Sequence, residues 1–275
     1  MKQRIITAIV LLLIAIPVCI FSGTILFPIV MAFIALAGVY EMLGCMGTRK
    51  NYFISIPLYI LAITSPFSVW REYNYFITNF RPDYSAILLP LLFALYLLAV
   101  WVFSYQKNQG VDMNKICTSA IVSLYIIGAT SSIVMVREGL GGEYYWYFIF
   151  IGAWITDIFA YFCGMLFGKK KLIEAVSPKK TVEGAIGGTI FCVIFFVVYG
   201  AILNRFTQYD INLVLVAFAG LLSAFVSMIG DLSMSVIKRT YGIKDYGKIF
   251  PGHGGVLDRF DSILAVSIVL AFFLA

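Results

Sequence analysis

Charged residues are scarce in this chain of 275 residues: Asp, Glu, Lys and Arg make up 12% of it, whereas apolar residues make up 61%. A soluble domain has about twice that charged fraction, so these charges are too few to cover a globule of this size. A disordered chain is excluded as well, because disorder requires low hydrophobicity. The apolar runs are continuous rather than alternating, which argues against a β-barrel. The composition therefore predicts an all-α, polytopic integral membrane protein.

Residues that bind metals through nitrogen or sulfur are also few. His253 is the only histidine, so a zinc site built on several histidines is excluded. The five cysteines are scattered and form no CxxC pair, so we expect free thiols. The motifs GxxxxGK[ST], GxGxxG, GxSxG and HExxH are absent. Any chemistry of this chain must therefore depend on other groups.

Nine apolar runs are long enough for a membrane-spanning helix, which needs about 20 residues. Basic residues precede the first run as in a signal peptide, but a second run follows at once, so we interpret the first as an uncleaved span. We expect one membrane domain, with about five spans in residues 1–144 and about four in residues 145–275. The expected spans are residues 5–21, 25–43, 52–70, 85–103, 117–136, 145–167, 185–203, 211–230 and 259–275.

The basic residues predict the orientation of these spans. With the N-terminus inside, 16 of the 20 Lys and Arg residues fall on the cytoplasmic side and 4 on the outer side. Cytoplasmic loops of membrane proteins are enriched in Lys and Arg. We therefore expect a cytoplasmic N-terminus and an outer C-terminus. The net charge of +6 is then explained by topology, and no nucleic acid partner is expected.

Four aspartates occupy costly positions. Asp157 lies well inside an apolar run, and Asp231 lies near the cytoplasmic end of the eighth span, while Asp258 and Asp261 open the ninth. A mid-span Asp costs roughly 2.5–3.5 kcal/mol on insertion scales. Carboxylates that meet at an interface suit Mg²⁺, which shares its oxygen shell with substrate phosphates. An ion pair such as Asp231 with Lys238 is an alternative, and Asp261 could be only a favourable charge at a helix N-terminus.

The first of two long basic loops, residues 168–184, contains the sequence SPKKTVEG at residues 177–184. A Ser-Pro pair is typical of a helix start, so we expect the two lysines on the first helical turn, where backbone N–H groups favour anions. The segment is a candidate phosphate cradle, with an ordinary positive-inside loop as the alternative. Its candidate substrate-binding residues are Ser177, Lys179, Lys180, Thr181 and Glu183.

The second basic loop is rich in glycine. Residues 235–261 read SVIKRTYGIKDYGKIFPGHGGVLDRFD. The Pro-Gly and Gly-Gly pairs that flank the histidine require unusual turns, which present backbone N–H groups and one imidazole beside two carboxylates. The candidate catalytic and binding residues of this segment are Lys238, Arg239, Lys244, Asp245, His253, Asp258 and Arg259.

Residues 235–261 resemble the signature of the phosphatidate cytidylyltransferases, also called CDP-diacylglycerol synthases. The match is long and gapless: SxxKRxxxxKDxGxxFPxHGGxxDRxD. Residues 177–184 and the pattern DxxAY at residues 157–161 resemble two further motifs of that family. The resemblance covers roughly residues 150–275, and the first half adds a compatible length and hydropathy.

The resemblance implies that CTP and phosphatidate react with Mg²⁺ to give CDP-diacylglycerol and diphosphate. We expect Asp231 and Asp258 to hold Mg²⁺, while Asp157 and Asp261 support that ion or a second one. Basic residues of both loops would balance the phosphates, and His253 would bind phosphate or assist proton transfer. CTP would come from the cytoplasm and the acyl chains would stay in the bilayer. A homodimer is expected from the family, and the short chain suits a bacterial inner membrane.

Three other functions stay open on the residues alone. A CTP-dependent lipid-alcohol kinase would share the nucleotide and the membrane, but its substrate would attack the γ-phosphate and CDP would be released. An ion-coupled transporter would spread its acidic residues along a path through the bilayer, whereas three of the four aspartates here lie at one face. A lipid-binding scaffold would need no clustered carboxylates.

Overall fold

A computed structural model describes residues 2–76 and 113–274 of the chain, and nearly all of its regular elements are helices. The elements are, in chain order, α1 (Lys2–Ile20), α2 (Leu26–Cys45), α3 (Tyr52–Phe76), α5 (Met113–Glu138), α6 (Gly142–Tyr145), α7 (Tyr147–Phe150), the π-helix η1 (Ile151–Ile155), α8 (Thr156–Phe167), the strands β1 (Lys171–Ile173) and β2 (Ser177–Thr181), α9 (Val182–Phe206), α10 (Leu213–Thr240) and α11 (Leu257–Leu274).

Six helical stretches among the described residues are long and apolar enough to cross a membrane. They coincide with six predicted spans and confirm a helical membrane protein. Helices α1 and α11 occupy the positions of the first and last predicted spans, and the predicted span 85–103 lies outside the described residues. The six stretches are Leu26–Cys45, Tyr52–Arg71, Asn114–Glu138, Gly142–Phe167, Val182–Phe206 and Leu213–Thr240.

The prediction of a helix start at Ser177 is wrong. Residues Lys171–Ile173 and Ser177–Thr181 form an antiparallel hairpin, so the fold is not purely helical. Helix α9 begins only at Val182, because Thr181 is the residue that caps it: its Oγ1 accepts a hydrogen bond of 3.1 Å from the N–H of Gly184. Pro178 lies instead in a strand at the edge of a two-stranded sheet, where a missing N–H is tolerated.

Two clusters of buried side chains join the halves of the chain. The first includes Met42 of α2 and Ile54 of α3 together with Leu264 of α11. The second packs Phe27 of α2 against Trp146, with their ring centroids 5.2 Å apart, and continues along α9, α10 and α11. Residues before and after position 144 therefore share both cores.

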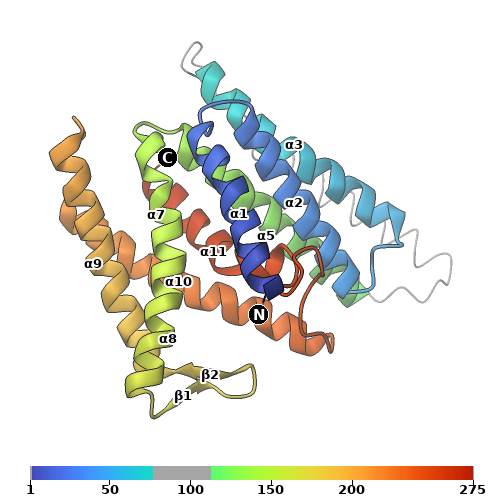
Figure 1. Ribbon diagram of the computed structural model, residues 1–275. Coiled ribbons are helices and arrows are strands. Elements are labelled where there is room, and N and C mark those ends of the chain that lie inside the picture. Colours follow the sequence, from blue (N-terminus) through green and yellow to red (C-terminus); the bar gives the residue numbers. More distant parts are fainter. Residues whose placement is uncertain (1, 77–112, 275) are drawn as a thin grey trace.

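The hairpin β1–β2, the loop between α10 and α11 and the start of α1 lie toward the same end of the helices, in the lower part of Figure 1, whereas the end of α11 lies toward the opposite end. A hydrogen bond joins two of these segments, since Thr7 Oγ1 of α1 donates to the carbonyl oxygen of Pro251 in the loop at 2.9 Å. Both basic loops are thus found at one end of the molecule.

Candidate active site

Aspartates from three helices are brought together where α8, α10 and α11 meet. Asp157 lies on the first turn of α8, Asp231 on α10 and Asp261 near the start of α11. Gly230 allows the last two helices to approach closely, because a Cβ at this position would lie 2.9 Å from the backbone oxygen of Asp261. Asp231 follows Gly230 directly in the sequence. The close contact between α10 and α11 therefore lies beside both Asp231 and Asp261.

Lys180 is the cation that the fold brings to this group. Its Nζ lies 2.5 Å from Oδ2 of Asp231, with side-chain exposures of 21% for the lysine and 26% for the aspartate. Ser235 Oγ donates a hydrogen bond of 3.3 Å to the other oxygen of Asp231. Within β2, Lys180 is half-buried while its neighbour Lys179 is exposed. The Nζ of Lys180 is itself buried, whereas the Asp231 side chain stays partly open to solvent.

Ser262 links the other two carboxylates. Its Oγ donates to Oδ2 of Asp157 at 3.1 Å, and its backbone N–H donates to Oδ1 of Asp261 at 2.9 Å. The negative charges of Asp157 and Asp231 both act on Asp261. Three carboxylates therefore share one region between the helices, with few hydrogen-bond donors from the protein.

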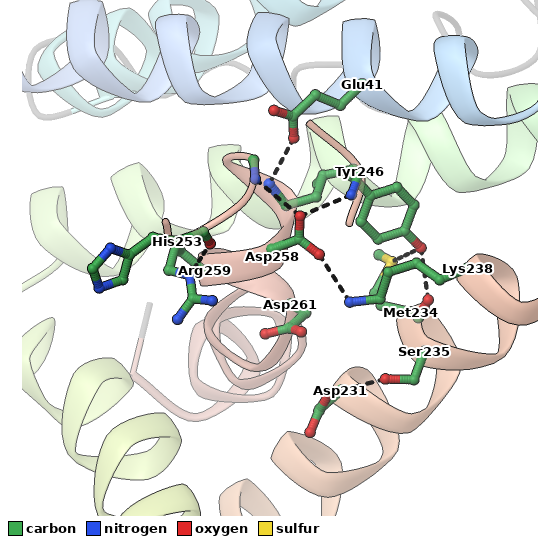
Figure 2. Close-up of polar contacts among 12 residues, drawn as sticks. Glu41, Asp231, Met234, Ser235, Lys238, Tyr246, His253, Asp258, Arg259 and Asp261 are labelled. Carbon is green, nitrogen blue, oxygen red and sulfur yellow. Dashed lines mark hydrogen bonds and ion pairs between the residues drawn. The ribbon is translucent and has the colours of Figure 1, made fainter. Parts of the chain in front are cut away.

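Asp258 has a different environment, as Figure 2 shows. Its Oδ1 forms an ion pair of 2.9 Å with Nζ of Lys238, and side-chain exposures are only 3% for the aspartate and 12% for the lysine. Its Oδ2 accepts hydrogen bonds from the backbone N–H groups of Tyr246, at 2.8 Å, and Gly255, at 2.9 Å. Hydrogen bonds to an ionised acceptor are the strong ones, so this carboxylate fixes the loop between α10 and α11.

The phenol of Tyr246 anchors the same loop to α10. It is 7% exposed, and its hydroxyl donates to the backbone oxygen of Met234 at 2.8 Å. Burial raises the pKa of Tyr246, so the hydroxyl keeps its proton and acts as a donor. Further along the loop, the predicted unusual turns are confirmed, because Gly252 and Gly254 have φ angles of 75° and 86°.

Glu41 is a site residue that the sequence analysis missed. It lies on α2 and is 2% exposed, and its carboxylate accepts hydrogen bonds from the N–H groups of Val256, at 3.0 Å, and Leu257, at 2.9 Å. The sequence does contain a signal for it, which is an acidic residue inside the predicted span 25–43. Its position near the end of that span made it look like an ordinary interfacial charge.

A cavity of about 790 Å³ opens beside the glycine-rich loop. Its lining combines charged and polar side chains, three of them basic, with glycines, Phe250 and Pro251. Arg259 is fixed at its edge because its Nε donates to the backbone oxygen of His253 at 2.9 Å. The predicted binding residues that line this cavity are Lys244, Asp245, His253 and Arg259. Its size and basic lining suit a phosphorylated ligand.

Within residues 2–76 and 113–274, no three His, Cys, Asp or Glu side chains lie close enough together to hold a metal ion by themselves. A divalent cation at this site would need further oxygen ligands from substrate. Mg²⁺ usually binds in that way, through one or two carboxylates plus substrate phosphates and waters.

A sequence model of the Cytidylyltransferase family matches residues 2–275. The chain belongs to this family. Three relatives, each named phosphatidate cytidylyltransferase, align over 97% of this chain and 96% of their own length. The protein of Staphylococcus haemolyticus is 32% identical over 269 residues, that of Staphylococcus saprophyticus 34% over 273, and that of Staphylococcus aureus strain COL 32% over 268. The similarity to cytidylyltransferases thus reaches the first half of the chain, where Glu41 lies.

The structure of this cytidylyltransferase pairs the charges differently from the simplest ion-pair interpretation. Asp231 pairs with Lys180 rather than Lys238, and Lys238 pairs with Asp258. Asp258 and Asp261, although one helical turn apart, therefore contact different groups. The exposed Arg239 lies in the last turn of α10.

Most of the SPKKTVEG segment of this cytidylyltransferase serves the hairpin rather than the carboxylates. The carboxylate of Glu183 accepts from the backbone N–H groups of Lys169, at 3.0 Å, and Lys170, at 3.2 Å. Ser177 pairs with Ile173 across the hairpin. Of the five predicted binding residues in this segment, Lys180 is the one that forms an ion pair with an aspartate of the site.

Proposed function

We propose that this protein transfers the cytidylyl group of CTP to phosphatidate, forming CDP-diacylglycerol and diphosphate. One observation carries the proposal: relatives named phosphatidate cytidylyltransferase are 32–34% identical over 97% of this chain. The phosphate of phosphatidate is already a nucleophile, so no Ser or Cys nucleophile is needed. Its oxygen bonds to the α-phosphorus of CTP while the bond from that phosphorus to the bridging oxygen of the diphosphate breaks, and the electron pair leaves with diphosphate.

We assign Mg²⁺ to the carboxylates of Asp231 and Asp261, with Asp157 beside them to support that ion or a second one. Oxygen ligands of this kind and number fit Mg²⁺. When bound, the ion would polarise the α-phosphate and neutralise charge on the diphosphate. Asp258 was predicted as a ligand, but both of its oxygens are engaged by Lys238 and backbone N–H groups. We therefore assign it to holding Lys238 and the loop.

Two lysines of the chain are available to the phosphates. Lys180 pairs with one carboxylate oxygen of Asp231, and its buried Nζ has no hydrogen-bond partner among the described residues, so a phosphate oxygen that enters the site can bind it. Lys238 is more deeply buried and is oriented by Asp258. Preorganised positive charge of this kind stabilises the charge that develops on transferring phosphoryl groups.

We place the nucleotide at the cavity beside the glycine-rich loop. Its volume of about 790 Å³ falls within the roughly 300–1,000 Å³ that is usual for ligand pockets. Lys244, Lys248 and Arg259 line it and would bind phosphate oxygens, and His253, whose buried Nδ1 has no hydrogen-bond partner among the described residues, would contribute a further polar group. The acyl chains of phosphatidate would stay in the bilayer while its phosphate reaches the carboxylates.

We also propose nine spans, a cytoplasmic N-terminus and an active site that faces the cytoplasm of a bacterial inner membrane. The bias of 16 to 4 in basic residues supports this orientation. So does the position of both basic loops near the start of α1 (Figure 1). A homodimer is proposed from the family alone.

Turnover by purified protein in mixed micelles tests the reaction. The assay contains phosphatidate, CTP labelled in its cytidine, and Mg²⁺, and it scores labelled lipid and released diphosphate. We expect CDP-diacylglycerol and diphosphate in equal amounts, and none after chelation of Mg²⁺. Release of CDP with a lipid alcohol as acceptor would instead support the kinase. No turnover of either kind by folded protein would reject both enzymes and direct attention to ion transport.

A further inference from the structure

We propose that Glu41 is a positioning residue for the nucleotide site: its carboxylate holds the glycine-rich loop and the start of α11 in the conformation that binds CTP. The identity of the ligand rests on the function proposed above, whereas the contact itself does not. The residue lies on the second helix, far in sequence from every motif that the resemblance identified.

The contact is a helix cap supplied by another helix. The N–H groups of Val256 and Leu257 are at the start of α11, where N–H groups have no partner within their own helix. Each oxygen of Glu41 accepts one of them, at 3.0 and 2.9 Å. A carboxylate at this position also interacts favourably with the helix dipole. Because Glu41 is 2% exposed, water does not readily replace it.

The loop also packs directly on this carboxylate. A Cβ built on Gly247 or on Gly255 would overlap Oε1 of Glu41. For Gly255, the three nearest atoms all belong to that carboxylate. Glycine is therefore needed at position 255 because Glu41 occupies the space, and not because of a left-handed backbone, which occurs at Gly254 instead.

Glu41 and Asp258 together accept hydrogen bonds from four backbone N–H groups, three of them on consecutive residues. Asp258 accepts from Tyr246 and Gly255, and Glu41 accepts from the next two residues. The loop that they hold supplies the lining of the 790 Å³ cavity, including Lys244. Loss of either carboxylate would therefore leave the lysines and glycines of the cavity without a fixed arrangement.

The first test is Glu41→Gln. The amide keeps the size of the side chain but offers one acceptor, so its NH₂ would face one of the two N–H donors. We expect CTP binding, measured by calorimetry without phosphatidate, to weaken at least tenfold and KM for CTP to rise by a similar factor. KM for phosphatidate should change less than twofold. Glu143→Gln, which alters an exposed carboxylate on α6, is the matched control and should change neither KM.

Two results would overturn the proposal. One is unchanged CTP binding in the folded Glu41→Gln protein. The other is an equal rise in both KM values together with a lower midpoint of thermal unfolding, which a general structural role would produce. If wild-type protein does not bind or turn over CTP at all, the proposed function fails, and the nucleotide role of Glu41 fails with it.

A second test needs no substrate. Gly255→Ala should lower the midpoint of thermal unfolding in the otherwise wild-type protein, because its methyl group overlaps the carboxylate of Glu41. In a Glu41→Ala background the space is free, so the same substitution should cost clearly less. Gly254→Ala is the control, since its cost comes from a φ of 86° and from close contact with Asp258 rather than with Glu41, and it should be similar in both backgrounds. Equal costs for Gly255→Ala in the two backgrounds would exclude the contact.

Discussion

Two groups of carboxylates lie near the start of α11, and they differ in what surrounds them. Glu41 and Asp258 are almost fully buried, and their oxygens are occupied by backbone N–H groups and, for Oδ1 of Asp258, by the ammonium of Lys238. Asp231 and Asp261 receive few donors from the protein: Ser235 donates to Asp231, as Figure 2 shows, and the N–H of Ser262 donates to Asp261. Asp231 also pairs with Lys180. The first group is committed to shaping the loop, whereas the second is free to bind a cation and substrate.

The two groups of carboxylates differ in the groups that contact their oxygens, not in their own chemistry. A buried carboxylate that loses a backbone N–H partner also leaves that N–H unsatisfied, and both losses are costly. The Asp231–Lys180 pair is less buried than the Asp258–Lys238 pair, so a metal ion or a phosphate can rearrange it at a lower cost. Substitutions in the two groups should therefore separate stability from turnover.

The largest expected effect is that of Asp258→Asn. It removes the charge that pairs with Lys238, which is only 12% exposed, and it weakens acceptance from Tyr246 and Gly255. Breaking a buried ion pair costs about 3–5 kcal/mol, so we expect both a lower midpoint of thermal unfolding in detergent and loss of turnover. Wild-type stability in this variant would show that Asp258 does not hold the loop.

Asp231→Asn should lower turnover strongly with a smaller loss of stability. It removes a carboxylate that the proposed Mg²⁺ would bind, and loss of one electrostatic contribution at a reacting phosphate lowers kcat by about 100- to 1,000-fold. The cost to the fold should be smaller than for Asp258→Asn, because the Asp231–Lys180 pair is less buried than the Asp258–Lys238 pair. Turnover and the unfolding midpoint are measured on the same preparation. A fall in stability as large as that of Asp258→Asn would contradict the division between the two groups.

The sequence predicted the spans and the aspartates of the site for a common reason, which is that the bilayer penalises polar groups. In the bilayer, a continuous apolar run satisfies its backbone N–H and C=O groups by forming a helix. An aspartate within such a run, such as Asp231, is costly and therefore stands out in the sequence. It could not predict which lysine pairs with which aspartate, because Lys180 and Asp231 meet only after β2, α9 and α10 have packed.

The hairpin was mispredicted for a similar reason. The Ser-Pro pair at residues 177–178 is compatible with a helix start and with an edge strand, and local sequence does not choose between them. The choice depends on more distant contacts, in particular the carboxylate of Glu183 on the N–H groups of Lys169 and Lys170. Glu41 escaped prediction because its donors lie at the other end of the chain.

The two lysines of β2 provide a smaller test of the comparison. Lys180→Gln should lower kcat/KM for CTP by about 10- to 100-fold, since a hydrogen bond to a charged group contributes about 1.5–3 kcal/mol. Lys179→Gln is the matched control: its side chain is exposed on the other face of the strand, and the effect should stay below about twofold. Equal effects of the two substitutions would mean that the loop acts only through its overall charge.

The smallest effect is expected from moving the carboxylates apart without changing them. A methyl group in Gly230→Ala would lie 2.6 Å from Cβ of Ala265 and would push α10 away from α11 beside Asp231 and Asp261. Overpacking of this kind costs about 1–3 kcal/mol, and we expect turnover to fall by several-fold with a higher requirement for Mg²⁺. Gly128→Ala on α5, where no atom lies within 4 Å of the added Cβ, should leave both quantities unchanged. A Mg²⁺ requirement equal to that of wild type in Gly230→Ala would show that the spacing of α10 and α11 does not set the metal site.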